Sequence, residues 1–422
     1  MPTADVVVIG AGLAGLSCAA ELVARGARVY LAAKGMASTH WTHGGVDVAA
    51  LPDAPTTRAG LLALAAVDGH PYATLASHVE PAVDAHASRL AAAGIGLTGS
   101  LDAPIVRVPT AIGALRPAAF LPDAQAPALE PWRGEGLLIV GFDRYRDAWP
   151  GYAARNLALA DWPGGPAEIR PVTVELDGLE RLHNLNARSL ATLFDEDPWR
   201  AQALRTIEGA IPPGAWRIGL PAVLGTASHQ EVLGEARALL GRGAFEIPSL
   251  PPSVPGIRLF EALRAAILGA GGRIQVGFDV VHVERRGRRV AAVHTEAASR
   301  TLRLAADRFV LATGGIGGQG IRAGVDGGLH EQVFGLAVTA PPPEQWFSDD
   351  PLVPHPIETA GIRTDEALRP LDAAGSAAFE NVHVIGSALA GMHYLGERCG
   401  DGVALASAYR VAGALAAGSV VA

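Results

Sequence analysis

Residues 4–34 constrain the fold of this chain more than any other stretch. The run Asp5 to Ile9 is apolar and β-branched, as in a buried parallel strand, and the motif Gly10-Ala11-Gly12-Leu13-Ala14-Gly15 follows it directly. Apolar residues then recur at helical spacing over 13–23, and residues 28–32 have the pattern of a second strand. The stretch therefore predicts a β-α-β unit.

The spacing of the glycines has a physical reason. Gly10 allows a tight turn after the strand, Gly12 lets the backbone approach a phosphate, and Gly15 lets the helix pack closely on the strand. The first helical turn, with Leu13 and Ala14, would offer N–H groups and a positive dipole end to the phosphate. The motif predicts a dinucleotide site; the alternative is a glycine-rich turn that binds nothing.

One residue expected of such a unit is missing. Dinucleotide-binding units usually carry Asp or Glu at the end of the second strand, where the carboxylate binds the ribose hydroxyls. Here Ala32, Ala33 and Lys34 occupy that place. The sequence thus supports phosphate binding but not the adenosine half, and Ala33 and Lys34 stay candidate cofactor contacts.

Length and composition limit the class of protein. With 422 residues, 49% hydrophobic and 18% charged, the chain suits a large α/β enzyme of more than one domain. The net charge of −8 argues against nucleic-acid binding, and we expect the short basic run 285–289 to be a hairpin turn. Cys18 and Cys399 are too few for an iron–sulfur cluster, so we expect no metal and a reducing cytoplasm. Residues 1–5 lack the basic region of a signal peptide.

The sequence divides into three parts by composition and hydrophobic pattern. Residues 1–100 and 256–422 have the strand and helix patterns of a nucleotide-binding domain. Residues 101–255, where proline and tryptophan become frequent, are expected to be an inserted α+β cap or partner-facing domain. In the last part we expect a helix over 259–270 and then strands at 280–284, 290–294, 301–304 and 308–313.

A loop rich in small residues follows the second predicted strand. It carries His40 and His43 between Ser38-Thr39 and Gly44-Gly45. Loops at the carboxyl edge of a parallel strand are where a second part of the ligand lies. The two histidines could face such a ligand, or they could form hydrogen bonds only within the loop.

Further motifs extend over nearly the whole chain: His70-Pro71-Tyr72 and the runs 108–117, 250–259, 361–370 and 381–404. With the opening glycines, they resemble the fumarate reductase and succinate dehydrogenase flavoprotein group and, more narrowly, the B subunit of the anaerobic glycerol-3-phosphate dehydrogenase. The resemblance implies an α/β fold, a Rossmann-like flavin-binding domain of glutathione-reductase type. Its parallel sheet and β-meander would be interrupted by the inserted α+β domain.

The resemblance also implies a flavin that is not covalently bound, because Ser38 stands where covalent members carry histidine. The implied flavin contacts beyond the opening motif are Ser38, Thr39, Gly44, Gly45, Thr313, Gly314, Gly386, Ser387, Gly402 and Val403. The last two belong to a glycine-rich helix start whose N–H groups could face the flavin edge that becomes negative on reduction. Asp401 beside them could be only a helix cap.

The form of the flavin stays open. Two acidic contacts typical of FAD-binding members are absent, since Ala33 and Ser387 stand at those positions. The B subunit of this dehydrogenase is described as an FMN protein, which these absences fit. The intact glycine motif instead favours the pyrophosphate of FAD.

The resemblance implies a subunit that relays electrons from sn-glycerol 3-phosphate, oxidised to dihydroxyacetone phosphate, toward a membrane quinone. The implied partners are a catalytic flavoprotein subunit and an iron–sulfur, membrane-associated subunit. Through them this chain would lie in the cytoplasm, at the inner face of the cell membrane. The alternatives are a stand-alone fumarate-reductase-like flavoenzyme and a flavin-containing structural subunit without its own substrate chemistry.

Five residues are candidate catalytic or charged groups for the small-molecule substrate: His40, His43, Arg258, His355 and Arg369. Arginine suits a phosphate or carboxylate because its planar fork binds two oxygens. The alternative for each of the five is ion pairing away from any site.

Overall fold

The computed structural model describes residues 4–51, 53–297 and 300–418. Within these residues the main sheet has seven strands, and five of them run parallel in the order β11-β2-β1-β14-β17. These five are β1 (Ala4–Ile9), β2 (Val29–Ala33), β11 (Arg273–Val276), β14 (Arg300–Leu311) and β17 (Val382–Val384). Helix α1 (Leu13–Ala24) connects β1 to β2, so the predicted β-α-β unit is confirmed.

Strands β12 (Asp279–Arg286) and β13 (Arg289–Ala297) form an antiparallel meander with β14, joined by the expected basic turn. The two strands expected at 301–304 and 308–313 are one strand, which corrects that prediction. The first half of β14 pairs with β13 as far as Ala305, and the second half pairs with β1 from Ala306. The strand therefore passes from the meander into the parallel sheet without a break.

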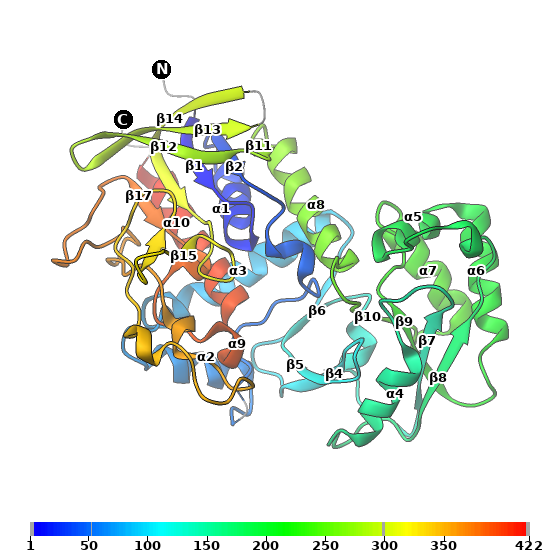
Figure 1. Cartoon of the computed structure of the whole chain (residues 1–422). Helices are drawn as coiled ribbons and strands as arrows, with labels where there is room; N and C mark the ends of the chain where they lie inside the picture. Colours follow the sequence, from blue (N-terminus) through cyan, green and yellow to red (C-terminus); the bar gives the residue numbers. More distant parts are fainter. Residues whose placement is uncertain (1–3, 52, 298–299, 419–422) are drawn as a thin grey trace.

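Four helices pack together beside the parallel strands (Figure 1). α1 packs against α10 (Gly400–Gly418) and α8 (Val254–Gly269), and α3 (Tyr72–Ala92) packs against both of these. The helix expected over 259–270 begins earlier, at Val254. The reason is local: the Ser253 hydroxyl accepts a hydrogen bond from the Gly256 N–H, and proline is tolerated in a first helical turn.

The inserted segment, residues 101–255, contains a second sheet with the order β10-β9-β7-β8, on the right in Figure 1. Every neighbouring pair in this sheet is parallel, and the segment also holds an antiparallel pair formed by residues 106–109 and 115–118. Helices connect the successive strands because parallel neighbours need a long crossover. The strands are β7 (Gly136–Phe142), β8 (Ile169–Val174), β9 (Trp216–Pro221) and β10 (Phe245–Ile247); the helices are α4 (Pro150–Leu159), α5 (Ala187–Asp195), α6 (Asp197–Gly209) and α7 (His229–Leu240).

Shorter elements complete the described chain. The remaining strands and α-helices are α2 (Thr57–Ala65), β3 (Leu97–Gly99), β4 (Val106–Pro109), β5 (Leu115–Ala118), β6 (Phe120–Pro122), β15 (Ile321–Ala323), β16 (Leu329–Glu331) and α9 (Tyr394–Glu397). The 3-10 helices are η1 (Ser38–Trp41), η2 (Ala126–Leu129), η3 (Leu179–Arg181), η4 (Pro343–Gln345), η5 (Pro356–Thr359) and η6 (Gly386–Ala388). No helix among the described residues combines the length and apolarity needed to cross a bilayer.

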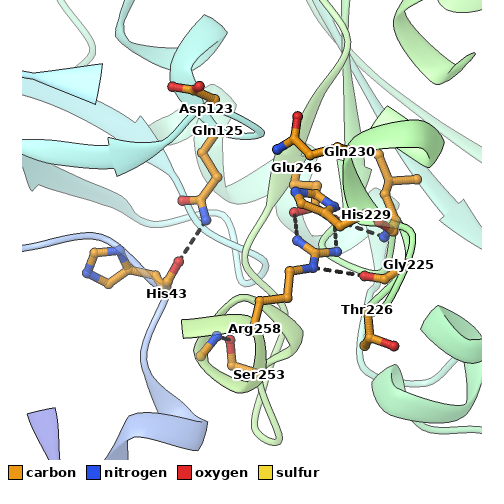
Figure 2. A network of polar contacts seen from close by, with 12 residues as sticks. His43, Asp123, Gln125, Gly225, Thr226, His229, Gln230, Glu246, Ser253 and Arg258 are labelled. Atoms are coloured by element: carbon orange, nitrogen blue, oxygen red, sulfur yellow. Dashed lines mark hydrogen bonds and ion pairs between the residues drawn. The ribbon is translucent and has the colours of Figure 1, made fainter. Parts of the chain in front are cut away.

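Buried apolar residues around the second sheet form clusters apart from the core of the main sheet. Polar contacts join the two parts (Figure 2). Arg258 of α8 contacts Glu246 of β10, and the Gln125 side chain donates a hydrogen bond to the carbonyl oxygen of His43. The division into domains at residues 100 and 255 stays a prediction.

Candidate functional site

A cleft of about 750 Å³ opens at the carboxyl ends of four parallel strands. Its wall includes Ile9 at the end of β1, Ala33 at the end of β2, Ala312 just after β14 and Ile385 just after β17. Ligands of open α/β sheets bind at this edge, because the loops that leave the strands converge there. The cleft is the candidate functional site.

The glycine motif shapes one wall of the cleft. Gly10 has a φ of +114°, and an added Cβ would overlap the carbonyl oxygen of Ala312. A Cβ at Gly15 would overlap the carbonyl oxygen of Gly10, so this glycine permits close packing of α1 on the strand. A Cβ at Gly12 would meet only Ala37 Cβ at 3.9 Å and would project into open space. Each glycine therefore has the surroundings that its predicted role requires.

The amino end of α1 is open to the cleft. Gly12 is the N-cap residue and provides no side-chain cap, while Leu13 and Ala14 line the cleft. The N–H groups of a first helical turn have no acceptor within the helix. Together with the positive end of the helix dipole, they form a site for a phosphate.

Hydroxyl groups supply further donors. Thr313 lines the cleft, and its Oγ1 atom is buried without a partner among the described residues. Ser387 lies beside Gly314 and Gly315, where its Oγ accepts the Gly315 N–H at 3.2 Å, so its own O–H can donate into the cleft. A large cleft with a phosphate site, an unpaired hydroxyl and apolar walls fits a flavin nucleotide.

A half-buried polar group, the Asp47–Asp401 cluster, consists of His43, Asp47, Arg116 and Asp401. Arg116 Nη2 donates to both carboxylate oxygens of Asp47, at 2.6 and 2.5 Å. The Asp47 N–H donates to Asp401 Oδ2 at 3.1 Å. His43 Nδ1 accepts the Gly45 N–H at 3.0 Å, so its Nε2 carries the proton of the neutral ring and faces Asp47 Oδ2 at 3.8 Å.

The surroundings set the charges in this cluster. Burial and the Asp47 charge raise the pKa of Asp401 to about 7. Burial also opposes ionisation of Asp47, but His43 and Arg116 outweigh it and lower the pKa of Asp47. Burial and Arg116 lower the pKa of His43. Near neutral pH, Asp47 is therefore ionised, His43 is neutral and Asp401 titrates.

Comparisons with known proteins decide the family. The model of the FAD binding domain family matches residues 5–403. A Halobacterium salinarum protein, named as a probable B subunit of anaerobic glycerol-3-phosphate dehydrogenase, is 33% identical, over 99% of this chain and 98% of its own. A Yersinia pestis protein, named as the B subunit of anaerobic glycerol-3-phosphate dehydrogenase, is 30% identical, over 97% of each chain. This chain belongs to the family of anaerobic glycerol-3-phosphate dehydrogenase B subunits.

Membership in this B-subunit family makes the chain a flavin-dependent oxidoreductase of the FAD-binding class, as the sequence predicted. Among solved structures, 3-ketosteroid Δ1-dehydrogenase from Sterolibacterium denitrificans aligns with 99% of this chain and 100% of its own, with a TM-score of 0.47 and 13% identity. The predicted α/β fold class is confirmed by the family match and by the parallel main sheet.

The cleft of this B-subunit homologue brings together most of the predicted flavin contacts. Those that line it are Gly10, Gly12, Leu13, Ala14, Ala33, Lys34, Ser38, Thr313, Gly314, Gly386 and Ser387. Those behind or beside this lining are Gly15, Thr39, Gly44, Gly45, Gly402 and Val403. Gly402 and Val403 donate their N–H groups to the carbonyl oxygens of Asp47 and Cys399, so neither N–H faces the cleft here.

The five candidate catalytic residues lie outside the lining of the cleft. His43 belongs to the Asp47–Asp401 cluster, and His40 packs its ring edge against Phe260. His355 Nδ1 accepts the Ser348 N–H at 3.0 Å. Arg258 and Arg369 are held by carboxylates. Of the five, His43 is connected through Asp47 to the cleft-lining Asp401, and His355 donates its backbone N–H to the cleft-lining Glu358 at 3.3 Å.

Sequence reasoning missed other residues of the cleft. Glu358 lines it from a segment that carries no motif, and Tyr394 lines it from the run 381–404 without having been predicted as a contact. Asp279 also lines it, and its carboxylate forms an ion pair with Lys34 Nζ at 2.5 Å. Thus the cleft has an acid near the end of β2, although β2 itself supplies none. The sequence carries no signal for this contact because the two residues belong to segments far apart in the chain.

Proposed function

We propose that this B-subunit homologue holds its flavin in the cleft and relays electrons from sn-glycerol 3-phosphate toward a membrane quinone. Dihydroxyacetone phosphate is the oxidised product. The open amino end of α1 at the cleft is the observation that carries the proposal, and the names of the relatives supply the substrate. The flavin supplies the electron-transfer chemistry, and the chain binds and orients it.

Within this proposal, each part of the cleft has a task. The first turn of α1 binds the flavin phosphate, with Gly12 leaving space for it. Thr313 and Ser387, which also line the cleft, donate hydrogen bonds to the flavin. Of the candidate catalytic residues, His43 has the best-supported role, because its ring faces Asp47, whose N–H binds Asp401 at the cleft, whereas His355 reaches Glu358 only through its backbone N–H. The flavin is held without a covalent bond, since Ser38 has no nucleophilic imidazole.

The proposed partners are a catalytic flavoprotein subunit and an iron–sulfur, membrane-associated subunit. The relatives are named as one subunit of a larger enzyme, which supports an assembly. Iron–sulfur clusters are typically held by four cysteine thiolates, whereas this chain has two cysteines. A partner would therefore carry electrons from the flavin to quinone and would hold this chain at the inner face of the cell membrane.

The assembled complex tests this proposal. The chain is purified through a tag from cells that make the complex, and the proteins that come with it are identified. Glycerol 3-phosphate is then added without oxygen, with glycerol as the control that lacks the phosphate. We expect both partner subunits to copurify and the flavin absorption to bleach with glycerol 3-phosphate only.

A matched variant isolates the flavin of this chain from that of the partner. Gly12→Ala blocks the phosphate site, so the difference between wild-type and variant complexes reports the flavin in this cleft. Full activity of the chain alone would favour a stand-alone enzyme. A flavin here that stays oxidised while the complex turns over would contradict the relay and leave a structural role for the chain.

A further inference from the structure

One carboxylate of the cleft has no part in the flavin contacts above. Asp401 lies in the first turn of α10 and lines the cleft. We propose that Asp401 binds one proton from solvent when the flavin is reduced and releases it when the flavin is reoxidised. This inference rests on the proposed position of the flavin in the cleft.

The hydrogen bonds decide which carboxylate of the Asp47–Asp401 cluster can bind a proton. Arg116 Nη2 contacts both oxygens of Asp47, and such a charge-assisted hydrogen bond favours the ionised carboxylate. Among the described residues, the Asp401 carboxylate receives only the backbone N–H of Asp47. Two neighbouring carboxylates do not both ionise readily, so the proton goes to Asp401. Its pKa, raised to about 7 by burial and by Asp47, agrees with this order.

The other titratable groups near Asp401 keep their charge near neutral pH. Burial lowers the pKa of His43 and raises the pKa of the Tyr72 hydroxyl and the Cys399 thiol, so all three stay neutral. The side-chain hydrogen bond from His70 lowers the pKa of Glu397 against the effect of burial, so Glu397 stays ionised. Arg116 and Arg398 add fixed positive charge. Among these groups, Asp401 is the one whose charge can change near neutral pH.

The proposed step is a simple protonation. Electrons from the substrate place negative charge in the cleft, which raises the free energy of a second negative charge on Asp401. The carboxylate then forms an O–H bond with a proton from solvent. When the electrons leave for the partner, this bond breaks and the proton returns to solvent. Arg116, from β5 of the inserted segment, acts as a positioning residue because it keeps Asp47 ionised.

The midpoint potential of the bound flavin, measured against pH, tests this inference. Each proton taken up with two electrons changes the potential of a two-electron couple by about 30 mV per pH unit. Above about pH 7 the oxidised protein has ionised Asp401, so the wild-type profile should be steeper than that of Asp401→Asn by about 30 mV per pH unit. Below about pH 6 Asp401 holds its proton in both states, and the two slopes should agree.

Matched variants complete the test. Glu358→Gln neutralises a second cleft carboxylate, which accepts N–H groups from His355 and Leu395, and it should keep the wild-type profile. Asp401→Ser also accepts the Asp47 N–H without titrating, and it serves if Asp401→Asn does not fold. Equal slopes for wild type and either Asp401 variant would overturn the inference while leaving the flavin site intact. A wild-type chain that binds no flavin would overturn the proposed function as well.

Discussion

Arg258 and Glu246 form an ion pair in which Nη1 and Oε2 lie 2.7 Å apart, although their side chains are only 4% and 0% exposed. Arg258 belongs to α8, beside the main sheet, and Glu246 belongs to β10 of the second sheet (Figure 2). Arg258 Nε also donates to the Gly225 carbonyl at 2.8 Å, and Glu246 accepts the Leu224 N–H at 2.9 Å. The pair therefore fixes the inserted segment to α8. This contact gives Arg258 a structural role that requires no binding of a substrate.

Breaking this pair should destabilise the protein strongly. Arg258→Leu leaves Glu246 buried without its cation, which typically costs about 3–5 kcal/mol in the free energy of unfolding. Urea denaturation measures the change. Arg264→Leu on the same helix is the control, since Arg264 and Glu261 are half-exposed and such a pair contributes about 1 kcal/mol or less. Equal effects of the two substitutions would show that the buried pair has no special role.

The phosphate site at α1 predicts a separation of binding from stability. Gly12→Ala should lower the unfolding midpoint only slightly, because the added methyl group meets only Ala37 and the one cost is that alanine is a poorer N-cap residue than glycine. Flavin affinity should fall roughly tenfold or more, the effect of losing one hydrogen bond to a charged group. Gly209→Ala at the end of α6 is a matched control with open space around it. Titration by flavin fluorescence measures the affinity, and wild-type affinity in Gly12→Ala would place the phosphate elsewhere.

Because of His86 in α3, we expect the folded protein to lose stability in acid. Burial lowers its pKa to about 4, and neither ring nitrogen has a partner among the described residues. The unfolded chain binds this proton near pH 6.5, so stability should fall as the pH drops from about 6.5 to 4, by at most about 3 kcal/mol. His86→Leu should remove this part of the dependence of stability on pH. His282→Gln should not remove it, because His282 on β12 is exposed. Unfolding curves at several pH values decide between them.

Because of Asp401, we expect the opposite dependence of stability on pH in the flavin-free protein. The folded chain holds the Asp401 proton up to about pH 7, whereas the unfolded chain releases it near pH 3.8. Stability should therefore fall as the pH rises from about 4 to 7, by at most about 4 kcal/mol from this group. Asp401→Asn should flatten that slope. An unchanged slope would mean that Asp401 ionises freely in the folded protein.

Local sequence patterns predicted the part of the site that one stretch of chain builds alone. The strand, the glycine turn and α1 are contiguous, so their roles could be assigned from residues 4–34. The contacts of Asp279 with Lys34 and of Arg116 with Asp47 join residues far apart in the chain, and single-sequence patterns carry no information on such pairs. The same limit explains β14, whose change of partner from β13 to β1 leaves no mark in its own sequence.

The candidate arginines illustrate a further limit. Arg369 Nε donates to Asp365 Oδ2 at 2.8 Å, four residues away, and Arg258 is bound by Glu246. An arginine that is held by a carboxylate in the fold has the same sequence signature as one that awaits a substrate anion. Burial and partners decide between these roles, and both depend on tertiary structure.

The most direct test of the account identifies what the cleft holds. The purified chain is treated with acid, and the released cofactor is identified by mass and counted per chain, with Gly12→Ala as the control. We predict one acid-released flavin per wild-type chain and less in the variant. FAD would mean that α1 binds a pyrophosphate, and FMN would mean that it binds the single phosphate of a shorter flavin. A wild-type chain without flavin, or with flavin that stays attached after acid treatment, would contradict the account.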